Sequence, residues 1–207
     1  MQIPGVQGRG PRIVVWSDYL CPWCYLALDR EQQLEDLGFD VIVRPWELHP
    51  EIPIGGRDIR EGGRTAQVFD FVGTECAEVG LPFVRPERSP NTRDVLAAAE
   101  HVRLTQPDVF PALHRALFAA HFAEGRDIGD ATVVDDIITR CGGDAAAVRA
   151  AIADGTAHAA LKASMDEGRE HEVMGTPAFL LPSGFVIPGV QSRETMARMA
   201  ERLLSRS

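Results

Sequence analysis

The pattern of apolar and polar positions predicts a strand, a helix and a second strand at the start of the chain. Ile13–Ser17 is a β-branched and aromatic run typical of a strand. A helix of about four turns is expected next, because leucines recur at roughly helical spacing before the stop signal Gly38: Leu26, Leu28, Leu34 and Leu37. Phe39–Arg44 predicts a second strand, ended by Pro45, which cannot donate to a ladder. Such a crossover is almost always right-handed and makes the two strands parallel neighbours.

The middle of the chain has a helical pattern instead. From Pro50 to about Glu172, alanine-rich stretches with helical periodicity replace the strand signals. Gly and Pro residues separate the predicted helices, which are Thr65–Glu78, Thr92–Leu104, Pro107–Phe122, Asp130–Arg140, Asp144–Ala153 and Ala157–His171.

Strand signals return near the end of the chain. Ala178–Leu181 and Phe185–Ile187 predict a hairpin through Pro182-Ser183-Gly184. Ser192 is the expected cap of a last helix, whose apolar stripe consists of Met196, Met199, Leu203 and Leu204. We therefore expect an α/β fold in which residues 12–50 and 173–205 form one split domain and residues 51–172 form a helical insertion. These limits follow from the composition shifts.

The motif Cys21-Pro22-Trp23-Cys24 lies where the first strand ends and the helix begins. The unpaired N–H groups and the macrodipole of the first turn favour a thiolate at Cys21, and such motifs lower a cysteine pKa from about 8.5 to about 3.5–7. The two-residue spacer puts Cys24 one turn behind, from where it can attack a disulfide between Cys21 and a substrate. Pro22 suits the first helical turn, and Trp23 would shield one side of the dithiol. The pair predicts thiol–disulfide chemistry, with Cys21 as nucleophile and Cys24 as resolving thiol.

A second element, Gly175-Thr176-Pro177, immediately precedes the predicted hairpin. An X–Pro bond costs only about 0.5–1 kcal/mol more in cis than in trans. A cis bond at Pro177 would push the backbone of Thr176 toward the sulfur of Cys21, which we expect to face solvent. The N–H and C=O of Thr176 would then pair with an extended substrate. By itself the tripeptide favours an ordinary trans turn, whereas together with the cysteine pair it favours the cis turn.

Composition and charge narrow the chemistry and the partners. The formal charge of −9 would repel phosphate backbones, so a nucleic-acid partner is not expected. The lone Cys76 and Cys141 argue against a structural zinc site, and we expect buried, inert thiols at both positions. We expect neither a metal nor an organic cofactor. Met1–Arg12 lacks the apolar run of a secretory signal and no segment is apolar enough to cross a membrane, so we expect a cytoplasmic protein if this is the native start.

These motifs resemble those of the DsbA-like thioredoxin family, and most closely its FrnE-like oxidoreductase branch. The resemblance runs over nearly the whole chain, through Ser17-Asp18 ahead of Cys21–Tyr25, Arg44–Pro50, Pro90–Thr92, Phe122–Asp130 and Gly175–Phe179. It implies a thioredoxin fold with a large helical insertion, a redox-active disulfide at Cys21 and Cys24, and a cis proline at Pro177. Ala178 stands where an aromatic residue is common and Trp46 where Phe is frequent, and both departures bear on substrate choice.

Several other polar residues have a functional and a structural interpretation. Asp18 would oppose the thiolate or accept the proton of the resolving thiol, although a capping or solvent-facing role is favoured. Trp46, Glu47 and His49 follow the second strand and would line the substrate groove at the sheet edge, or else serve packing and turns. His114 and His121 would share a face of one helix but lack metal-ligand spacing, so surface or core polar roles are favoured.

The function expected from these observations is disulfide exchange with a protein or a small-thiol partner, in a direction that the motif leaves open. The expected substrate-binding residues are Trp23, Trp46, Thr176 and Pro177. The alternative is a glutathione-type isomerase or reductase of an aromatic small molecule, similar to the 2-hydroxychromene-2-carboxylate isomerases. Such enzymes need one activated group at the helix start, so Cys24 argues against this alternative. A third hypothesis, a non-enzymatic holdase or metal-binding module, predicts ordinary thiols. A homodimer also stays open, because an apolar groove would fit a substrate and a second subunit equally well.

Overall fold

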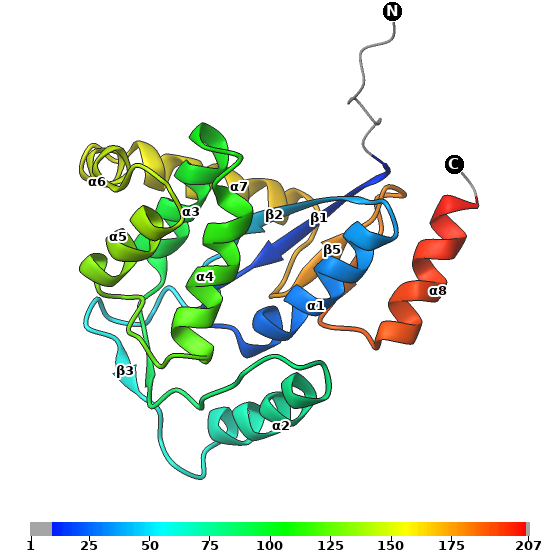
Figure 1. The fold of residues 1–207 in the computed structure, drawn as a ribbon, viewed down its shortest axis with the longest axis horizontal. Helices are drawn as coiled ribbons and strands as arrows, with labels where there is room; N and C mark the ends of the chain where they lie inside the picture. The colour runs from blue at the N-terminus through cyan, green and yellow to red at the C-terminus, as the bar shows by residue number, and fades with distance from the viewer. Residues whose placement is uncertain (1–9, 206–207) are drawn as a thin grey trace, which may run out of the picture.

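A four-stranded sheet forms the centre of the fold (Figure 1). The computed structural model describes residues 10–205, and within them this sheet has the strand order β2-β1-β5-β6. β1 and β2 are parallel, β5 is antiparallel to β1, and β6 is antiparallel to β5. The elements around the sheet are β1 (Arg12–Ser17), α1 (Pro22–Asp36), β2 (Asp40–Pro45), β5 (Ala178–Leu180), β6 (Val186–Pro188) and α8 (Arg193–Leu204). The predicted α/β fold class is confirmed.

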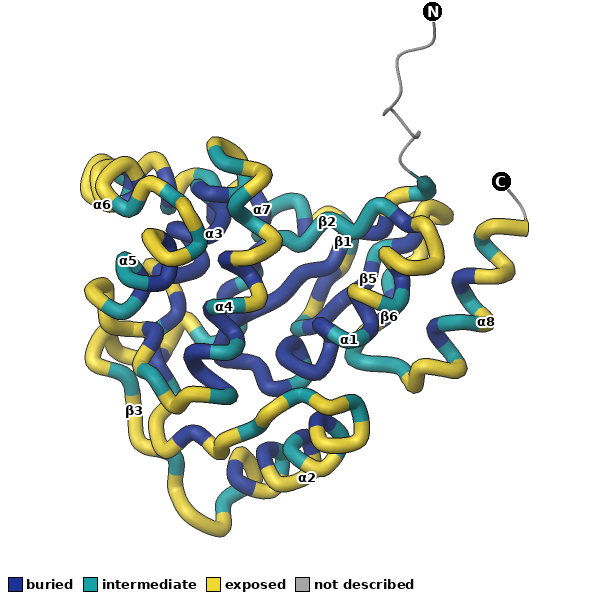
Figure 2. The backbone as a smooth tube through the Cα atoms, in the orientation of Figure 1, coloured by how far each residue is buried: buried dark blue, intermediate teal, exposed yellow. Residues whose placement is uncertain are grey.

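The segment between β2 and β5 is mainly helical, as predicted. Its helices are α2 (Arg64–Glu78), α3 (Arg93–Thr105), α4 (Phe110–Phe122), α5 (Ala131–Arg140), α6 (Ala145–Ala153) and α7 (Thr156–Glu170). Asp130 and Asp144 cap α5 and α6 by accepting hydrogen bonds from the N–H groups of Thr132 and Ala147, which is why the sequence located these two starts well. Buried residues of these helices and of α1 form one hydrophobic cluster, seen as dark-blue stretches in Figure 2.

A short two-stranded ladder interrupts the helical segment. β3 (Arg57–Asp58) pairs antiparallel with β4 (Arg88–Ser89), and the Arg88 and Asp58 side chains form an ion pair across it. Each strand is two polar residues long, so neither carries the alternation that signals a strand in the sequence. The expectation of a purely helical pattern between the two halves of the sheet is therefore wrong at this point. The domain limits drawn from the sequence stay a prediction.

None of the helices within residues 10–205 has the length and apolar character that a membrane crossing requires. Most of the N-terminal stretch on which the expected location depends, residues 1–9, lies outside the described residues.

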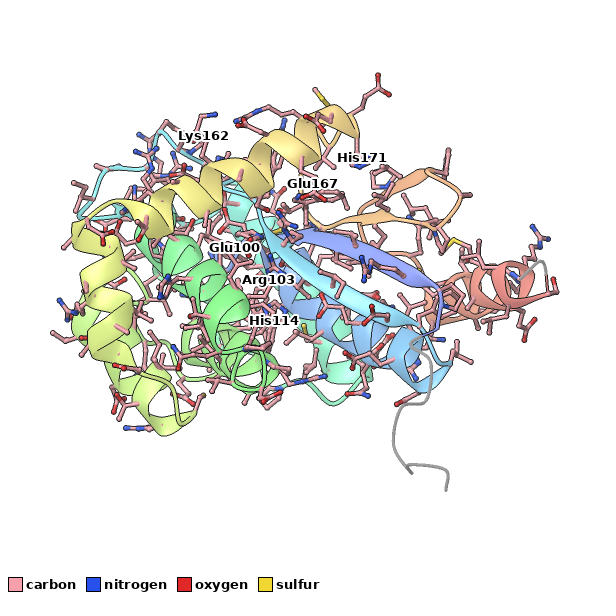
Figure 3. The ribbon with its side chains drawn as sticks, turned by 90° about the horizontal axis from the view of Figure 1, so that it is seen from above. Glu100, Arg103, His114, Lys162, Glu167 and His171 are labelled. Atoms are coloured by element: carbon pink, nitrogen blue, oxygen red, sulfur yellow. The ribbon has the colours of Figure 1, made fainter. Side chains whose placement is uncertain are left out.

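Helices cover the sheet on both faces because successive residues of β1 point in opposite directions. Ile13 and Val15 pack against Leu34 of α1 in a cluster that also includes α8 residues. Trp16 points the other way, where its indole N–H donates to the carbonyl oxygen of Ser164 in α7 over 3.1 Å. Figure 3 shows α7 along this second side of the sheet. The C-terminal ends of β1 and β2 are thus held between α1 and α7.

A charged network centred on the buried Glu100 joins α3 and α7 to the sheet, and Figure 3 labels Glu100, Arg103 and Glu167. Glu100 of α3 is 1% exposed and accepts hydrogen bonds from the Arg103 guanidinium at 2.6 and 2.8 Å. Arg44 of β2 lies between Glu100 and Glu167, at 3.5 and 2.8 Å. Removing one partner would leave a buried charge uncompensated, which is strongly destabilising. The network therefore fixes the end of β2, after which Trp46 follows.

Gly168 sets how closely α7 approaches the sheet, and Gly168→Ala tests this. A Cβ atom there would lie 2.7 Å from the ring of Trp46 and 3.0 Å from Nε1 of Trp16. We expect overpacking to lower the free energy of unfolding by about 1–3 kcal/mol, although alanine has the better helix propensity by about 1 kcal/mol. Urea unfolding measures the change. Gly55→Ala is the control, because a Cβ there meets no atom within 4 Å; a stabilised Gly168→Ala protein would contradict the packing argument.

Candidate active site

Cys21 lies where the chain leaves the sheet and enters α1. It is the N-cap residue of this helix, with an extended backbone, and Pro22 occupies the first turn. The carbonyl oxygen of Cys21 accepts hydrogen bonds from the N–H groups of Cys24 and Tyr25, at 3.0 and 3.2 Å. Its own N–H donates to the carbonyl oxygen of Asp18 over 3.0 Å. The sulfur is thereby placed at the open N-terminal end of a helix, as the motif predicts.

Cys21 and Cys24 are free thiols with unequal acidities. A hydrogen bond from the Cys24 thiol lowers the pKa of Cys21 against the effect of burial, and the Thr176 side chain and the Cys24 N–H lower it further. Burial raises the pKa of Cys24 well above its usual range, and the bond to Cys21 raises it more. Cys21 therefore ionises first. The neighbouring thiol thus adds to the effect that the sequence predicts for the helix terminus.

Cys21 is less accessible than the sequence argument assumed. The residue is 3% exposed and Cys24 is 0% exposed. The loop before β5 covers the sulfur, since the carbonyl oxygen of Thr176 lies 3.5 Å from it. The expectation that the sulfur faces solvent is therefore wrong. A loop more than a hundred residues away in the sequence covers the sulfur and leaves little of Cys21 exposed.

This covering loop is hydrogen-bonded through the backbone of Pro177 but, in the described part of the chain, not through the N–H of Thr176. The peptide bond between Thr176 and Pro177 is cis. The carbonyl oxygen of Pro177 accepts a hydrogen bond from the N–H of Gly189 over 2.7 Å. Within residues 10–205, by contrast, neither the N–H nor the hydroxyl of Thr176 has a hydrogen-bond partner. A backbone donor therefore lies unpaired beside the Cys21 sulfur.

Asp18 is buried, so a solvent-facing role is wrong for it, whereas its bonds to backbone N–H groups fit the other favoured interpretation, a capping role. It is 0% exposed, because its carboxylate accepts hydrogen bonds from the N–H groups of Leu48 and Leu20, at 2.7 and 3.2 Å. Burial raises its pKa to about 6, the nearby Glu47 charge adds to the rise, and the hydrogen bonds oppose it. The Asp18 charge in turn raises the pKa of Cys21, the direction expected for a carboxylate near a thiolate.

Three buried hydroxyl oxygens near these ionisable groups have no hydrogen-bond partner within the described part of the chain, those of Ser17, Thr92 and Thr176. They lower the pKa of Cys24, Asp18 and Cys21, respectively. A buried polar group without a partner costs about 1–3 kcal/mol. Each of these hydroxyls can recover part of this cost by donating to its neighbour when that neighbour becomes charged. No role for the Ser17 or Thr92 hydroxyl follows from the sequence motifs. The strand alternation would have indicated Ser17 as an inward-facing polar residue.

The two tryptophans expected at the substrate site lie in different surroundings. Trp23 is half-buried beside the dithiol and contacts the ring of Phe71 in α2, with centroids 5.6 Å apart. Trp46 belongs to the cluster on the α7 side of the sheet, and the Arg169 guanidinium lies 5.8 Å from its ring centroid. The structure therefore brings Trp23 to the cysteines and packs Trp46 beneath α7.

Glu47 and His49 make contacts of their own instead of joining the dithiol. Glu47 is 7% exposed and accepts hydrogen bonds from the Arg93 guanidinium at 3.0 and 3.2 Å. His49 pairs with Glu51 over 2.9 Å. Both contacts hold the loop whose Leu48 N–H binds Asp18. Their position favours the structural interpretation.

An open groove of about 630 Å³ borders the Thr176–Pro177 loop. Its most exposed apolar side chains are Met174 and Phe185, at 91% and 66%, and Val186 also lines it. The groove extends from the end of α7 to the β5–β6 hairpin. It therefore places exposed apolar side chains next to the unpaired N–H of Thr176.

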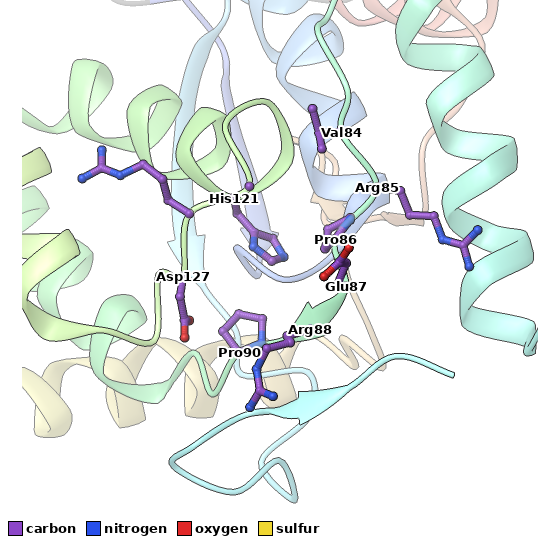
Figure 4. A pocket seen from close by; sticks show the side chains of 10 residues that line it. Val84, Arg85, Pro86, Glu87, Arg88, Pro90, His121 and Asp127 are labelled. Carbon is purple, nitrogen blue, oxygen red and sulfur yellow. The ribbon is translucent and has the colours of Figure 1, made fainter. Parts of the chain in front are cut away.

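The two histidines predicted on one helix are both buried residues of α4, each 4% exposed. His114 lies between the Tyr19 hydroxyl and the Glu31 carboxylate, at 3.1 and 3.3 Å. His121 lines a separate hollow of about 330 Å³, shown in Figure 4, and burial lowers its pKa to about 4. Among residues 10–205, no cluster of His, Cys, Asp and Glu side chains could hold a metal ion. Of the surface and core polar roles favoured by the sequence, the core role fits both histidines.

The remaining cysteines differ from each other. Cys76 is 0% exposed, and burial raises its pKa to about 11, in agreement with a buried, inert thiol. Cys141 is only partly buried, so the expectation of a buried thiol is wrong there. It follows the end of α5 directly and precedes two glycines, where few side chains are available to cover it.

Comparison with known proteins gives a single family and fold. The family model described as a DSBA-like thioredoxin domain matches residues 12–200. The probable DsbA oxidoreductase of Streptomyces coelicolor is 24% identical, with a TM-score of 0.84 over 96% of this chain and 92% of that chain. A 2-hydroxychromene-2-carboxylate isomerase is 17% identical, with a TM-score of 0.71 over 95% and 99%. The cytosolic disulfide reductase DsbM from Pseudomonas aeruginosa with GSH is 18% identical, with a TM-score of 0.65 over 94% and 99%. At these identities the structures share the fold.

Asp18→Asn should raise stability above pH 6 and lower the pKa of Cys21. Burial raises the carboxyl pKa from about 3.9 in the unfolded chain to about 6, so the fold favours the protonated form. Stability is therefore present below pH 4 and is lost as the pH rises from about 4 to about 6, by up to about 3 kcal/mol. Urea unfolding at pH 4 and pH 7.5 should show a gain for the variant only at the higher pH. A gain of equal size at both pH values would contradict a buried ionisation.

Proposed function

Because the chain belongs to the DSBA-like thioredoxin domain family, we propose that it is a thiol-disulfide oxidoreductase acting through Cys21 and Cys24. The observation that carries the proposal is the placement of Cys21 at the N-terminal end of α1, one turn before Cys24, whose thiol lowers the pKa of Cys21. Thiolates rather than thiols attack disulfides. An activated Cys21 with a second sulfur in hydrogen-bonding contact is the arrangement that two-step exchange requires.

The proposed reaction has two displacements. The Cys21 thiolate attacks one sulfur of a substrate disulfide, forms a mixed disulfide and releases the other substrate sulfur as a thiolate. Cys24 then loses its proton, attacks Cys21 and releases the second substrate sulfur, leaving a Cys21–Cys24 disulfide. The two protons given up by the cysteines balance the two taken up by the substrate thiols. The reverse sequence oxidises a substrate dithiol.

Further residues have proposed roles around this exchange. The unpaired N–H of Thr176 would bind an extended substrate, Pro177 would hold that backbone in place, and Trp23 would cover the other side of the sulfur. Asp18 would modulate the dithiol through its charge. Trp46 would act from beneath α7, as a support of the β2 end. We also propose membership of the FrnE-like branch and action in the cytoplasm; a cytosolic disulfide reductase shares this fold.

For the substrate, we propose a polypeptide disulfide over a small thiol. The groove beside Thr176 has a volume of about 630 Å³, and Met174 and Phe185 expose most of their apolar surface there. Burying one such side chain against a partner contributes about 1.5–3 kcal/mol. An extended peptide paired with the Thr176 N–H would carry its side chains into this groove, whereas glutathione offers no large apolar group.

The alternative function is a glutathione-dependent isomerase or reductase of an aromatic small molecule. The fold is shared with a 2-hydroxychromene-2-carboxylate isomerase, but that likeness concerns the fold. Isomerisation at an activated helix-start group has no use for a second sulfur. The hydrogen bond from Cys24 to Cys21 therefore favours exchange.

Trapping with glutathione disulfide tests the role of each cysteine. After incubation and removal of excess reagent, intact-protein mass spectrometry should find an internal disulfide in the wild type, a single glutathione adduct in Cys24→Ala, and neither in Cys21→Ala. The first result follows because Cys24 displaces glutathione from Cys21. Cys141→Ala is the control and should behave as the wild type. Full isomerase turnover of an aromatic substrate by Cys24→Ala with glutathione would support the alternative function.

Serine substitutions at Met174 and Phe185 test the substrate class. We expect each to lower kcat/KM about 10-fold for a peptide disulfide with apolar flanking residues, with less than a twofold change for glutathione disulfide. Leu104→Ser is the matched control, because Leu104 is 56% exposed and lies on α3. Equal losses with both substrates would argue against a peptide site. A changed oligomeric state in size-exclusion chromatography would instead identify the groove as an interface between copies of the chain.

A further inference from the structure

Ser17 and Cys24 face each other across the contact between β1 and α1. Ile13 and Val15 point from β1 toward α1, so strand alternation directs the Ser17 side chain to the same face. On the helix, Ala27 belongs to the same cluster. Cys24 lies one turn before Ala27, in the cluster that α1 forms with the inserted helices, and the Ser17 hydroxyl acts on its sulfur. At the end of the apolar contact between β1 and α1, the Ser17 hydroxyl therefore lies opposite the Cys24 sulfur.

The buried Ser17 hydroxyl lowers the stability of the fold in this position. The residue is 4% exposed, and its oxygen has no hydrogen-bond partner within residues 10–205. The backbone carbonyl oxygen of Ser17 is already paired, since it accepts from the N–H of Trp46 over 2.9 Å. An alanine would satisfy the strand geometry without a buried unpaired group, which is destabilising. Such a group suits a partner that becomes an acceptor only during the reaction.

Cys24 becomes such an acceptor when it resolves the mixed disulfide. The residue is 0% exposed, so water does not solvate the thiolate that must form. The Ser17 hydroxyl lowers the pKa of Cys24 against the effect of burial. The Thr176 side chain acts in the same direction but also lowers the pKa of Cys21. The Thr176 side chain thus acts on both sulfurs, whereas the Ser17 hydroxyl acts on the resolving sulfur of Cys24.

We propose that Ser17 is a further catalytic residue, whose hydroxyl donates a hydrogen bond to the Cys24 sulfur while that sulfur displaces the substrate from Cys21. The inference rests on the proposed function. In this step the Cys24 thiolate forms a bond to the Cys21 sulfur, the bond between Cys21 and the substrate breaks, and the substrate sulfur leaves with the electron pair. The proton lost by Cys24 is balanced by the one that the departing substrate thiolate takes up. Ser17 is neither oxidised nor deprotonated.

Reaction with a disulfide that releases a coloured thiol separates the attack by Cys24 from the earlier attack by Cys21. The reduced protein is mixed at pH 6 with excess 5,5′-dithiobis(2-nitrobenzoate), in a Cys141→Ser background because Cys141 is partly exposed. Attack by Cys21 releases the first thionitrobenzoate, and attack by Cys24 on the resulting mixed disulfide releases the second. The first phase depends on the reagent concentration and the second does not. Their rates report the two sulfurs separately.

Ser17→Ala should slow the second phase about 3- to 10-fold and leave the first within twofold. Losing a hydrogen bond to a charged group lowers the fraction of Cys24 present as thiolate about 10-fold. A more basic thiolate is also a stronger nucleophile, so the rate of attack falls by less than this fraction. The midpoint of thermal unfolding should stay equal or rise. Ser17→Gly, which also lacks the hydroxyl, serves as the second variant if the alanine protein does not fold.

Ser164→Ala is the matched control, since this buried serine donates to the carbonyl oxygen of Pro45 over 2.9 Å, away from the cysteines. It should lower the unfolding midpoint without slowing the second phase. An unchanged second phase in Ser17→Ala, or equal slowing of both phases, would overturn the role of Ser17. Release of only one thionitrobenzoate by the background protein would instead refute the proposed dithiol function.

Discussion

The hydrogen bond between the Cys24 thiol and the Cys21 sulfur is the contact on which the site depends. It makes two identical side chains unequal, so one sulfur carries the charge while the other keeps its proton. The bond requires α1 to begin at Pro22 and to lie firmly on the sheet, which the cluster around Ile13, Val15 and Leu34 provides. Ordinary apolar packing therefore determines an acid–base property. Burial contributes as well, because hydrogen bonds are stronger where water is excluded.

The insertion completes this environment. Cys21 and Cys24 belong to the hydrophobic cluster formed by the inserted helices, and the side chain of Thr92, just before α3, acts on Asp18. The same cluster holds Tyr19, whose hydroxyl contacts His114 of α4. The sheet thus supplies the position of the sulfurs, and the insertion supplies much of the low-dielectric surroundings that separate their acidities.

Strands and helices that are encoded by local sequence patterns could be predicted. Burial and contacts that depend on residues far apart in the sequence could not. The alternation of Ile13–Ser17 and the caps at Asp130 and Asp144 are encoded within a few neighbouring residues, so strand and helices could be predicted. The burial of Asp18 depends on the N–H of Leu48 in another loop, which no local pattern announces. The exposure of Cys21 was misjudged for the same reason, since Thr176 covers it. β3 and β4 were missed because two polar residues give no periodicity.

The contact between Cys21 and Thr176 joins positions 155 residues apart. A ribosome adds about 5–20 residues per second, so a nascent chain carries its nucleophilic cysteine for roughly 8–30 s before the residue that covers it is synthesised. During that interval the sulfur lacks its contact with Thr176 and the part of its buried surroundings that later residues supply. The complete environment of the nucleophile can therefore form only after most of the chain has been synthesised.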